Sequence, residues 1–124
     1  MSTRNKRILV CEDDRHIAEI IALILQSRNY DILTLPNGDG IEKATQEYSP
    51  DLILLDLWMP DADGMAAARI IKNNPSHKHI PIIVISALSD AQRMAHDIRA
   101  DDFLAKPFEM NDLLAAVGKY TGTD

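Results

Sequence analysis

The fold of this chain is decided by the stretch DLILLDLWMP, which runs from Asp51 to Pro60. Four consecutive large aliphatic residues lead into the carboxylate of Asp56, and Pro60 prevents the strand from continuing because proline has no backbone N–H to donate. A short apolar run of this kind is typical of a strand that is buried on both faces of a sheet. The stretch therefore places Asp56 at the carboxyl end of a central strand, where ligands bind in open α/β sheets.

Strands of this kind alternate with helices along the whole chain. We expect strands at residues 8–11, 30–35, 52–56, 80–85 and 102–105. Apolar residues at spacings of three and four predict helices at residues 17–27, 41–48, 64–73, 89–98 and 110–117, with fraying from residue 118 onward. Regular alternation predicts the α/β class, as a doubly wound parallel five-stranded sheet with helices on both faces.

The composition is that of one globular domain. With 124 residues, of which 46% are apolar, the chain can bury one substantial core, and we expect a single domain over residues 1–124 with its core at about 7–120. A net charge of −6 disfavours direct binding to nucleic acid and suits a cation at an acidic site. The single cysteine agrees with a reducing compartment, and no apolar run reaches the roughly 20 residues of a membrane helix. We therefore expect a cytoplasmic protein with no membrane partner.

Polar residues follow or end four of the predicted strands. They are Glu12, Asp13, Asp56, Ser86 and Lys106. Because the carboxyl ends of parallel strands lie along one edge of a sheet, these residues are expected to converge. Three neighbouring carboxylates repel one another, and a hard divalent cation with oxygen ligands relieves that repulsion. The sequence therefore predicts a site for Mg²⁺, which Mn²⁺ can also fill.

The remaining groups suggest phosphate chemistry at this site. Asp56 is the natural nucleophile because an aspartate can form an acyl phosphate, while Ser86 offers a hydrogen-bond donor and Lys106 a positive charge for phosphoryl oxygens. Taken singly, Ser86 can be an ordinary turn residue and Lys106 a solvated surface lysine, and we expect Asp14 to cap the following helix. Asp56 is harder to explain without a function, because burial of an unused carboxylate is costly.

At this point the sequence resembles the receiver domain of two-component response regulators. The matching segments are residues 8–14 (ILVCEDD), 51–64, 82–87 and 100–108, and the resemblance extends over residues 7–120. It implies a flavodoxin-like fold with strand order 2-1-3-4-5. It also implies that a sensor histidine kinase or a histidine phosphotransfer protein transfers a phosphoryl group to Asp56 in a Mg²⁺-dependent reaction, which then switches a protein-interaction surface.

The resemblance also suggests roles for the acidic residues. Asp56 matches the phosphoacceptor, Asp13 the direct Mg²⁺ ligand, and Glu12 its partner. Trp58, two residues after Asp56, would offer Mg²⁺ its backbone carbonyl oxygen. The metal site implied by the resemblance therefore comprises Glu12, Asp13, Asp56 and Trp58.

The resemblance also implies a switch formed by residues of the last two predicted strands and the residues that follow them. Ser86 and Lys106 would each contact a phosphoryl oxygen, and Lys106–Pro107 matches a peptide bond that is cis in the family. Phe103 stands where the family has an aromatic residue that rotates inward behind Ser86, although plain core packing is an alternative interpretation of Phe103. Two features depart from the family. The separation of Ser86 and Lys106 is short, and Arg99 replaces a frequent glycine, so we expect an altered fourth helix.

The implied output is an interaction, since the only chemistry expected acts on the protein itself. The downstream partner is an unidentified protein, a covalently linked effector or, after phosphorylation, a second copy of the chain. Nothing after Val117 resembles an effector domain, so the chain is either a single-domain regulator or part of a longer protein. Two alternatives stay open: a phosphorylation-independent scaffold, and a phosphohydrolase of the haloacid dehalogenase type. The latter needs a second aspartate two residues after the nucleophile, where this chain has Trp58. Finally, all four histidines are interpreted as surface residues.

Overall fold

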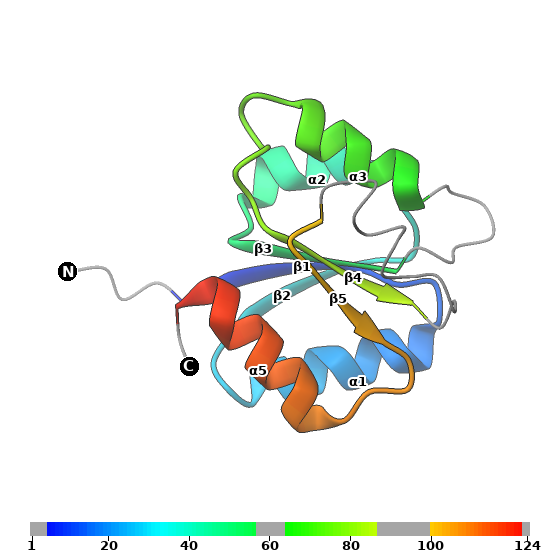
Figure 1. Ribbon diagram of the computed structural model, residues 1–124, viewed down its shortest axis with the longest axis vertical. Coiled ribbons are helices and arrows are strands. Elements are labelled where there is room, and N and C mark those ends of the chain that lie inside the picture. The colour runs from blue at the N-terminus through cyan, green and yellow to red at the C-terminus, as the bar shows by residue number, and fades with distance from the viewer. Residues whose placement is uncertain (1–4, 57–63, 87–99, 123–124) are drawn as a thin grey trace.

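A five-stranded parallel sheet lies between two layers of helices (Figure 1). The structure is a computed structural model, and it describes residues 5–56, 64–86 and 100–122. The strands are β1 (Arg7–Cys11), β2 (Asp31–Leu35), β3 (Leu52–Asp56), β4 (Ile82–Ser86) and β5 (Asp102–Ala105), in the order β2-β1-β3-β4-β5. The described helices are α1 (Arg15–Gln26), α2 (Ile41–Tyr48), α3 (Gly64–Asn73) and α5 (Met110–Thr121). The predicted fold class and strand order are confirmed.

The central strands are apolar on both faces because both faces are covered. All residues of β3 and β4 are buried. Successive side chains point to opposite faces of a sheet, so Ile53 packs in a cluster with Ile71 of α3, whereas Leu54 packs in a cluster with Leu25 of α1. Figure 1 shows α2 and α3 on one face of the sheet, and α1 and α5 on the other. Because every strand pair is parallel, the carboxyl ends of the strands lie along one edge of the sheet.

Helix α1 begins directly beside that edge. The Asp14 side chain accepts hydrogen bonds from the backbone N–H groups of His16 (2.9 Å) and Ile17 (3.2 Å), so Asp14 is the predicted N-cap. The short connection from β1 therefore keeps Glu12 and Asp13 next to the sheet, while Asp14 serves the helix.

The predicted fraying from residue 118 is wrong. Helix α5 continues through Gly118 to Thr121 and is capped by Gly122, whose φ of 73° is the left-handed conformation that glycine adopts without strain. Gly118 is buried, and the Thr121 hydroxyl donates to Val117 O (2.8 Å) and lies 3.2 Å from the Tyr30 hydroxyl. These tertiary contacts stabilise a last turn that local propensity alone does not support.

One histidine also contradicts the sequence interpretation. His77 is only 8% exposed, whereas His16 and His79 are exposed as expected and His96 lies outside the described residues. The backbone N–H of His77 donates to Asn74 O (2.9 Å), and its carbonyl oxygen accepts from Ile80 N (2.9 Å). Hydrogen bonds within this turn between α3 and β4 therefore hold the backbone of His77. Hydrophobic periodicity does not predict such a turn.

Two further expectations can be compared with the described part of the chain. The altered fourth helix falls on residues 89–98, outside the described residues. None of the described helices combines the length and the hydrophobicity that crossing a lipid bilayer requires.

Candidate functional site

Five of the predicted residues meet at the carboxyl edge of the sheet. Glu12 and Asp13 follow β1, and Asp56 and Ser86 are the last residues of β3 and β4. Lys106 follows β5, where its backbone N–H donates to Ser86 O (3.1 Å). Residues that are up to 94 positions apart in sequence (12 to 106) therefore share one site.

The carboxylates form a compact cluster of oxygen donors. One ligand oxygen from each of Glu12, Asp13 and Asp56 lies within 4.8 Å of the other two. Glu12 and Asp56 are buried, at 3% and 2% exposure, while Asp13 is exposed. Such a site, with protein oxygens on one side and access for water on the other, fits the ligand preference of Mg²⁺.

Lys106 connects two of these carboxylates. Its Nζ lies 2.9 Å from Glu12 Oε1 and 3.1 Å from Asp56 Oδ2, where it also donates a hydrogen bond to Asp56. Burial by itself lowers the pKa of Lys106, but its contacts with the two carboxylates outweigh burial and leave the pKa above its ordinary value. Lys106 is therefore a firmly held ammonium group in contact with Asp56.

The surroundings of Glu12 disfavour the charged form of its carboxyl group. Burial and the neighbouring Asp56 raise the pKa of Glu12 to about 7, although Lys106 acts in the opposite direction. Apart from the ion pair with Lys106, Glu12 Oε1 has no hydrogen-bond partner among the described residues. Glu12 and Asp56 thus share the Lys106 ammonium group, and the negative charge that remains on the three clustered carboxylates is suited to a divalent cation.

The remaining predicted residues are placed as follows. The Lys106–Pro107 peptide bond is cis. Phe103, in β5, is half-buried and packs against the cluster that includes Ile71, an arrangement that suits both a switch residue and an ordinary core residue. Ser86 is completely buried. Trp58 lies outside the described residues.

Comparison with known families identifies the chain. Residues 8–118 match the response regulator receiver domain. The chain is a response regulator receiver domain. The family binds Mg²⁺ at an acidic pocket, and in this chain Glu12, Asp13 and Asp56 form a cluster of acidic residues.

Relatives of this receiver domain include larger regulators. It is 32% identical over 119 residues to the DNA-binding response regulator MtrA of Mycobacterium tuberculosis, covering 94% of this chain and 51% of that protein. It is 40% identical over 114 residues to the response regulator ArlR of Staphylococcus aureus, covering 90% of this chain and 50% of that protein. The chain thus spans about half the length of these curated relatives.

Solved structures agree with the fold. The receiver domain is 32% identical to TrrA of Thermotoga maritima, whose crystal structure is a complex with Mg²⁺ and BeF, at a TM-score of 0.83 over 93% of this chain and 98% of that chain. It is 27% identical to the receiver domain of sensor histidine kinase PA1611 of Pseudomonas aeruginosa, at a TM-score of 0.87 over 95% and 98% of the two chains. That structure has a magnesium ion coordinated in the active site cleft.

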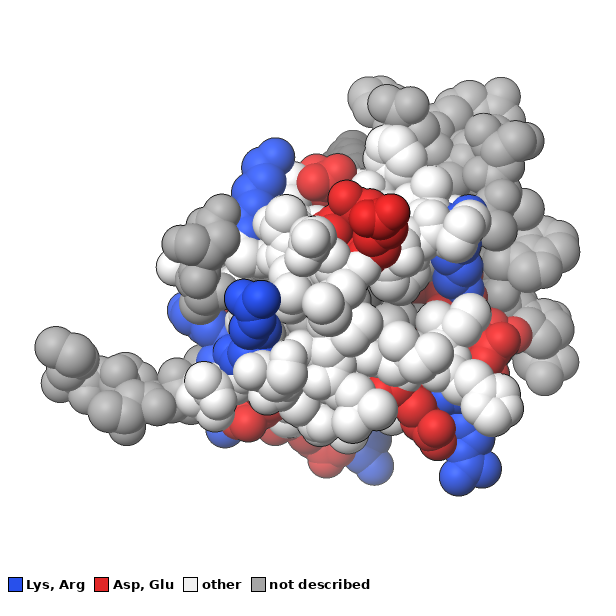
Figure 2. Space-filling model, turned by 90° about the horizontal axis from the view of Figure 1, so that it is seen from below, with Lys and Arg blue, Asp and Glu red and all other residues white. Residues whose placement is uncertain are grey.

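The receiver domain also has an apolar groove that the sequence reasoning missed. The groove has a volume of about 340 Å³ and borders the site at Lys106. Its apolar lining comes from α1 and from the segment after Lys106, namely Ile17, Ile20, Ile21, Pro107 and Phe108. Figure 2 looks onto the face formed by α1 and α5, and uncharged side chains cover most of its centre. The sequence signal was the uninterrupted apolar run from Ile20 to Leu25, which is wider than one buried helix face needs.

Proposed function

We propose that this receiver domain accepts a phosphoryl group on Asp56 from a phosphohistidine of a sensor histidine kinase or a histidine phosphotransfer protein. The observation that carries the proposal is the contact of Lys106 Nζ with Asp56 Oδ2 (3.1 Å) inside a cluster of three carboxylates. An aspartate in this environment can act as a nucleophile toward phosphorus, because Lys106 and a bound divalent cation would neutralise the charge of the phosphoryl oxygens.

In the proposed reaction a carboxylate oxygen of Asp56 forms a bond to phosphorus while the bond between phosphorus and the imidazole nitrogen breaks. The imidazole leaves with the electron pair of that bond. Glu12, Asp13 and Asp56, with the backbone carbonyl of Trp58, would hold Mg²⁺, which when bound supplies positive charge to the phosphoryl oxygens. Lys106, already an ammonium group at Asp56, is in position to pair with one of these oxygens.

Phosphorylation then changes the contacts of Lys106 and Ser86. Phosphoryl oxygens compete with Glu12 for the Lys106 ammonium group, and Ser86 donates to another phosphoryl oxygen. Movement of Ser86 leaves space that Phe103 can enter from β5, which alters the surface around that strand. Hydrolysis of the acyl phosphate by water releases inorganic phosphate and restores the unphosphorylated Asp56 carboxylate. This chemistry acts on the receiver alone, so its output is a change of binding partner.

The exposed side of the site and the apolar groove suggest how the phosphodonor binds. A phosphohistidine must approach Asp56 over the exposed side of the site, and the apolar groove next to Lys106 offers the phosphodonor a contact area. The downstream partner is a separate protein, a linked effector or a second copy of the chain. Because MtrA is described as DNA-binding and the receiver covers only half of it, any action on DNA is proposed for a linked domain and not for this one. We also propose that residues 1–124 form one domain.

The test is incubation with acetyl phosphate and Mg²⁺, followed by mass spectrometry. We expect one added phosphoryl group on Asp56, loss of the adduct in Asp56→Ala, and an unchanged adduct in Asp39→Asn, which changes an exposed carboxylate. No adduct on the wild type would leave the scaffold interpretation, and turnover of external phosphate esters would favour a phosphohydrolase. Omission of Mg²⁺ should slow the reaction strongly, because nothing else described at the site relieves the three carboxylates except Lys106.

A further inference from the structure

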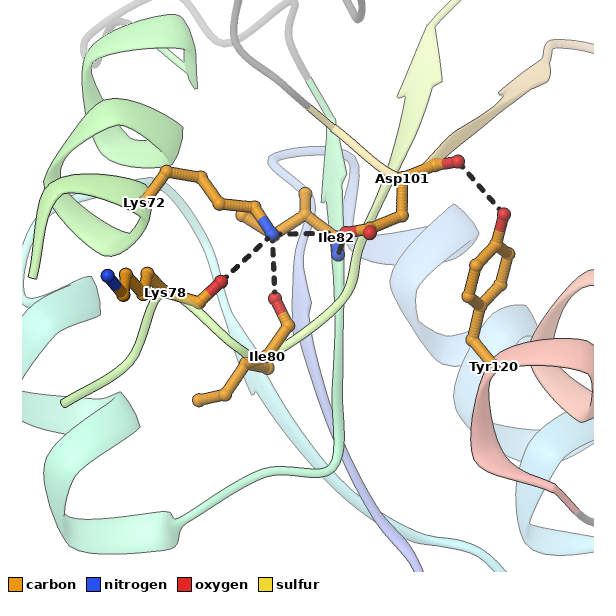
Figure 3. A network of polar contacts seen from close by, with 6 residues as sticks. All are labelled: Lys72, Lys78, Ile80, Ile82, Asp101 and Tyr120. Atoms are coloured by element: carbon orange, nitrogen blue, oxygen red, sulfur yellow. Dashed lines mark hydrogen bonds and ion pairs between the residues drawn. The ribbon is translucent and has the colours of Figure 1, made fainter. Parts of the chain in front are cut away.

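A polar junction at the opposite end of β5 from the site has no role in the function proposed above. It consists of Lys72, Asp101, Ile82 and Tyr120, which come from α3, the residue before β5, the start of β4 and α5 (Figure 3). We name it the Asp101 junction. Asp101 is the residue on which the other three converge.

Asp101 is bound to β4 in two ways. Its backbone N–H donates to Ile82 O (2.9 Å), and its Oδ2 accepts from Ile82 N (2.8 Å). The side chain therefore takes the place of a ladder acceptor, and the two bonds extend the pairing of β5 with β4 by one residue. In the register of the two strands Asp102 lies opposite Ile83, so Asp101 and Ile82 are the next pair.

Lys72 reinforces this contact from α3. Its Nζ lies 3.1 Å from Asp101 Oδ2 and 3.0 Å from Ile80 O, with Lys78 O at 3.4 Å, and its side chain is only 12% exposed. Three oxygens thus surround a largely buried ammonium group. Tyr120 completes the junction because its hydroxyl donates to Asp101 O (2.9 Å). The backbone N–H, the carbonyl oxygen and Oδ2 of Asp101 are all engaged.

Strand β5 needs such support because it is short and lies at the edge of the sheet, next to β4. It has four residues, none of them fully buried. Phe103 packs against one core cluster and Leu104 against the other, and a slip of one residue would move both side chains to the opposite faces. Lys106 directly follows β5, so a slip would carry its Nζ away from Asp56 by about 3.3 Å along the strand.

We propose that Lys72 and Asp101 are positioning residues for Lys106. They fix the register of β5 at its amino end, and the bond from Lys106 N to Ser86 O (3.1 Å) fixes it at the carboxyl end. Asp101 is five residues before Lys106, or about 16 Å along a strand, so it acts on the phosphorylation site only through β5. The effect on phosphorylation rests on the proposed function, whereas the effect on the register does not.

The register is tested by amide hydrogen exchange followed by NMR. In Asp101→Ala and Lys72→Met we expect exchange at the Lys106 N–H to accelerate by roughly tenfold, the scale of coupling between contacting groups. The Ile53 N–H, which donates to Pro81 O (3.0 Å) in the centre of the sheet, should keep its rate. Lys43→Met is the matched control, because Lys43 is exposed on α2. Equal acceleration at both amides would show general destabilisation and overturn the proposal.

The link to Lys106 is tested by a double-mutant cycle on the rate of phosphorylation by acetyl phosphate. Asp101→Ala should slow the reaction by roughly tenfold in the wild-type background and have little effect in a Lys106→Ala background. Asp101→Asn, which keeps an acceptor for Ile82 N, should recover most of the rate. Equal losses in both backgrounds would overturn the positioning role. If the wild type takes up no phosphoryl group, the proposed function fails, and the exchange measurement alone decides whether the junction sets the register.

Discussion

Replacing Glu12 by glutamine removes a buried negative charge from the acidic site while keeping the shape of the side chain. The pKa of Glu12 is about 7 in the folded protein, against 4.5 in the unfolded chain. A group whose folded pKa is raised contributes stability that is fully present below its unfolded pKa and is lost as the pH rises through the folded pKa. The metal-free wild type should therefore lose stability between about pH 4.5 and about pH 7 because Glu12 must ionise beside Asp56.

The size of the loss follows from the shift. The difference between about 7 and 4.5 is 2.5 pKa units, which at about 1.36 kcal/mol per unit corresponds to about 3 kcal/mol. Glu12 is only 3% exposed, so solvent screens little of this energy. Glu12→Gln resembles the neutral form at every pH. We therefore expect the variant to match the wild type near about pH 4 and to be more stable by up to about 3 kcal/mol near about pH 8.

The assay is urea denaturation of both proteins in EDTA, followed by circular dichroism across this pH range. Glu47→Gln serves as the control, because Glu47 is an exposed glutamate of α2 and its loss should leave the pH profile unchanged. Addition of Mg²⁺ near about pH 8 should stabilise the wild type more than Glu12→Gln, since a ligand that binds only the folded state stabilises it by an amount that rises with the logarithm of its concentration divided by its Kd. A stability difference between wild type and Glu12→Gln that stays constant with pH would refute this reasoning.

Three further changes test a helix cap, core packing and a buried hydrogen bond of the fold, each by the midpoint of chemical denaturation. Asp14→Ala should destabilise the domain by about 1 kcal/mol through loss of the α1 cap, and an unchanged midpoint would contradict that role. Leu54→Ala should cost about 2–5 kcal/mol because the side chain is completely buried, whereas Leu23→Ala, at 68% exposure, should change stability by less than about 0.5 kcal/mol. Tyr30→Phe removes the buried hydroxyl 3.2 Å from Thr121 Oγ1 and should destabilise the domain by about 1 kcal/mol. An unchanged midpoint would contradict a stabilising role for this hydroxyl.

Local sequence patterns predicted most elements because the patterns report directly on burial. The helix at Gly64–Asn73 and the strand at Asp102–Ala105 have the predicted bounds. The strand predicted at 80–85 instead begins at Ile82, because Ile80 belongs to the turn that buries His77. The end of α5 was also misplaced. Both errors lie where tertiary contacts, and not periodicity, determine the backbone.

The approach of Glu12, Asp13, Asp56, Ser86 and Lys106 to one edge of the sheet followed from strand topology alone. Parallel strands present their carboxyl ends together, so a residue at each end needs no further information to find the others. The length and order of the apolar runs were sufficient for that inference. The distances between these side chains could not be inferred, since the sequence does not say which carboxylate contacts the Lys106 ammonium group.

The sequence by itself therefore determined the fold class and the set of residues at the acidic edge, because periodicity and the rules of parallel connection act through the chain itself. The strand order was implied by the resemblance to receiver domains and not by periodicity. Only the tertiary structure decided that Lys106 contacts both Glu12 and Asp56, that an apolar groove borders Lys106, and that Lys72 contacts Asp101 at the far end of β5. These features depend on side-chain directions between elements far apart in sequence. Packing in three dimensions sets those directions, and no local pattern encodes them.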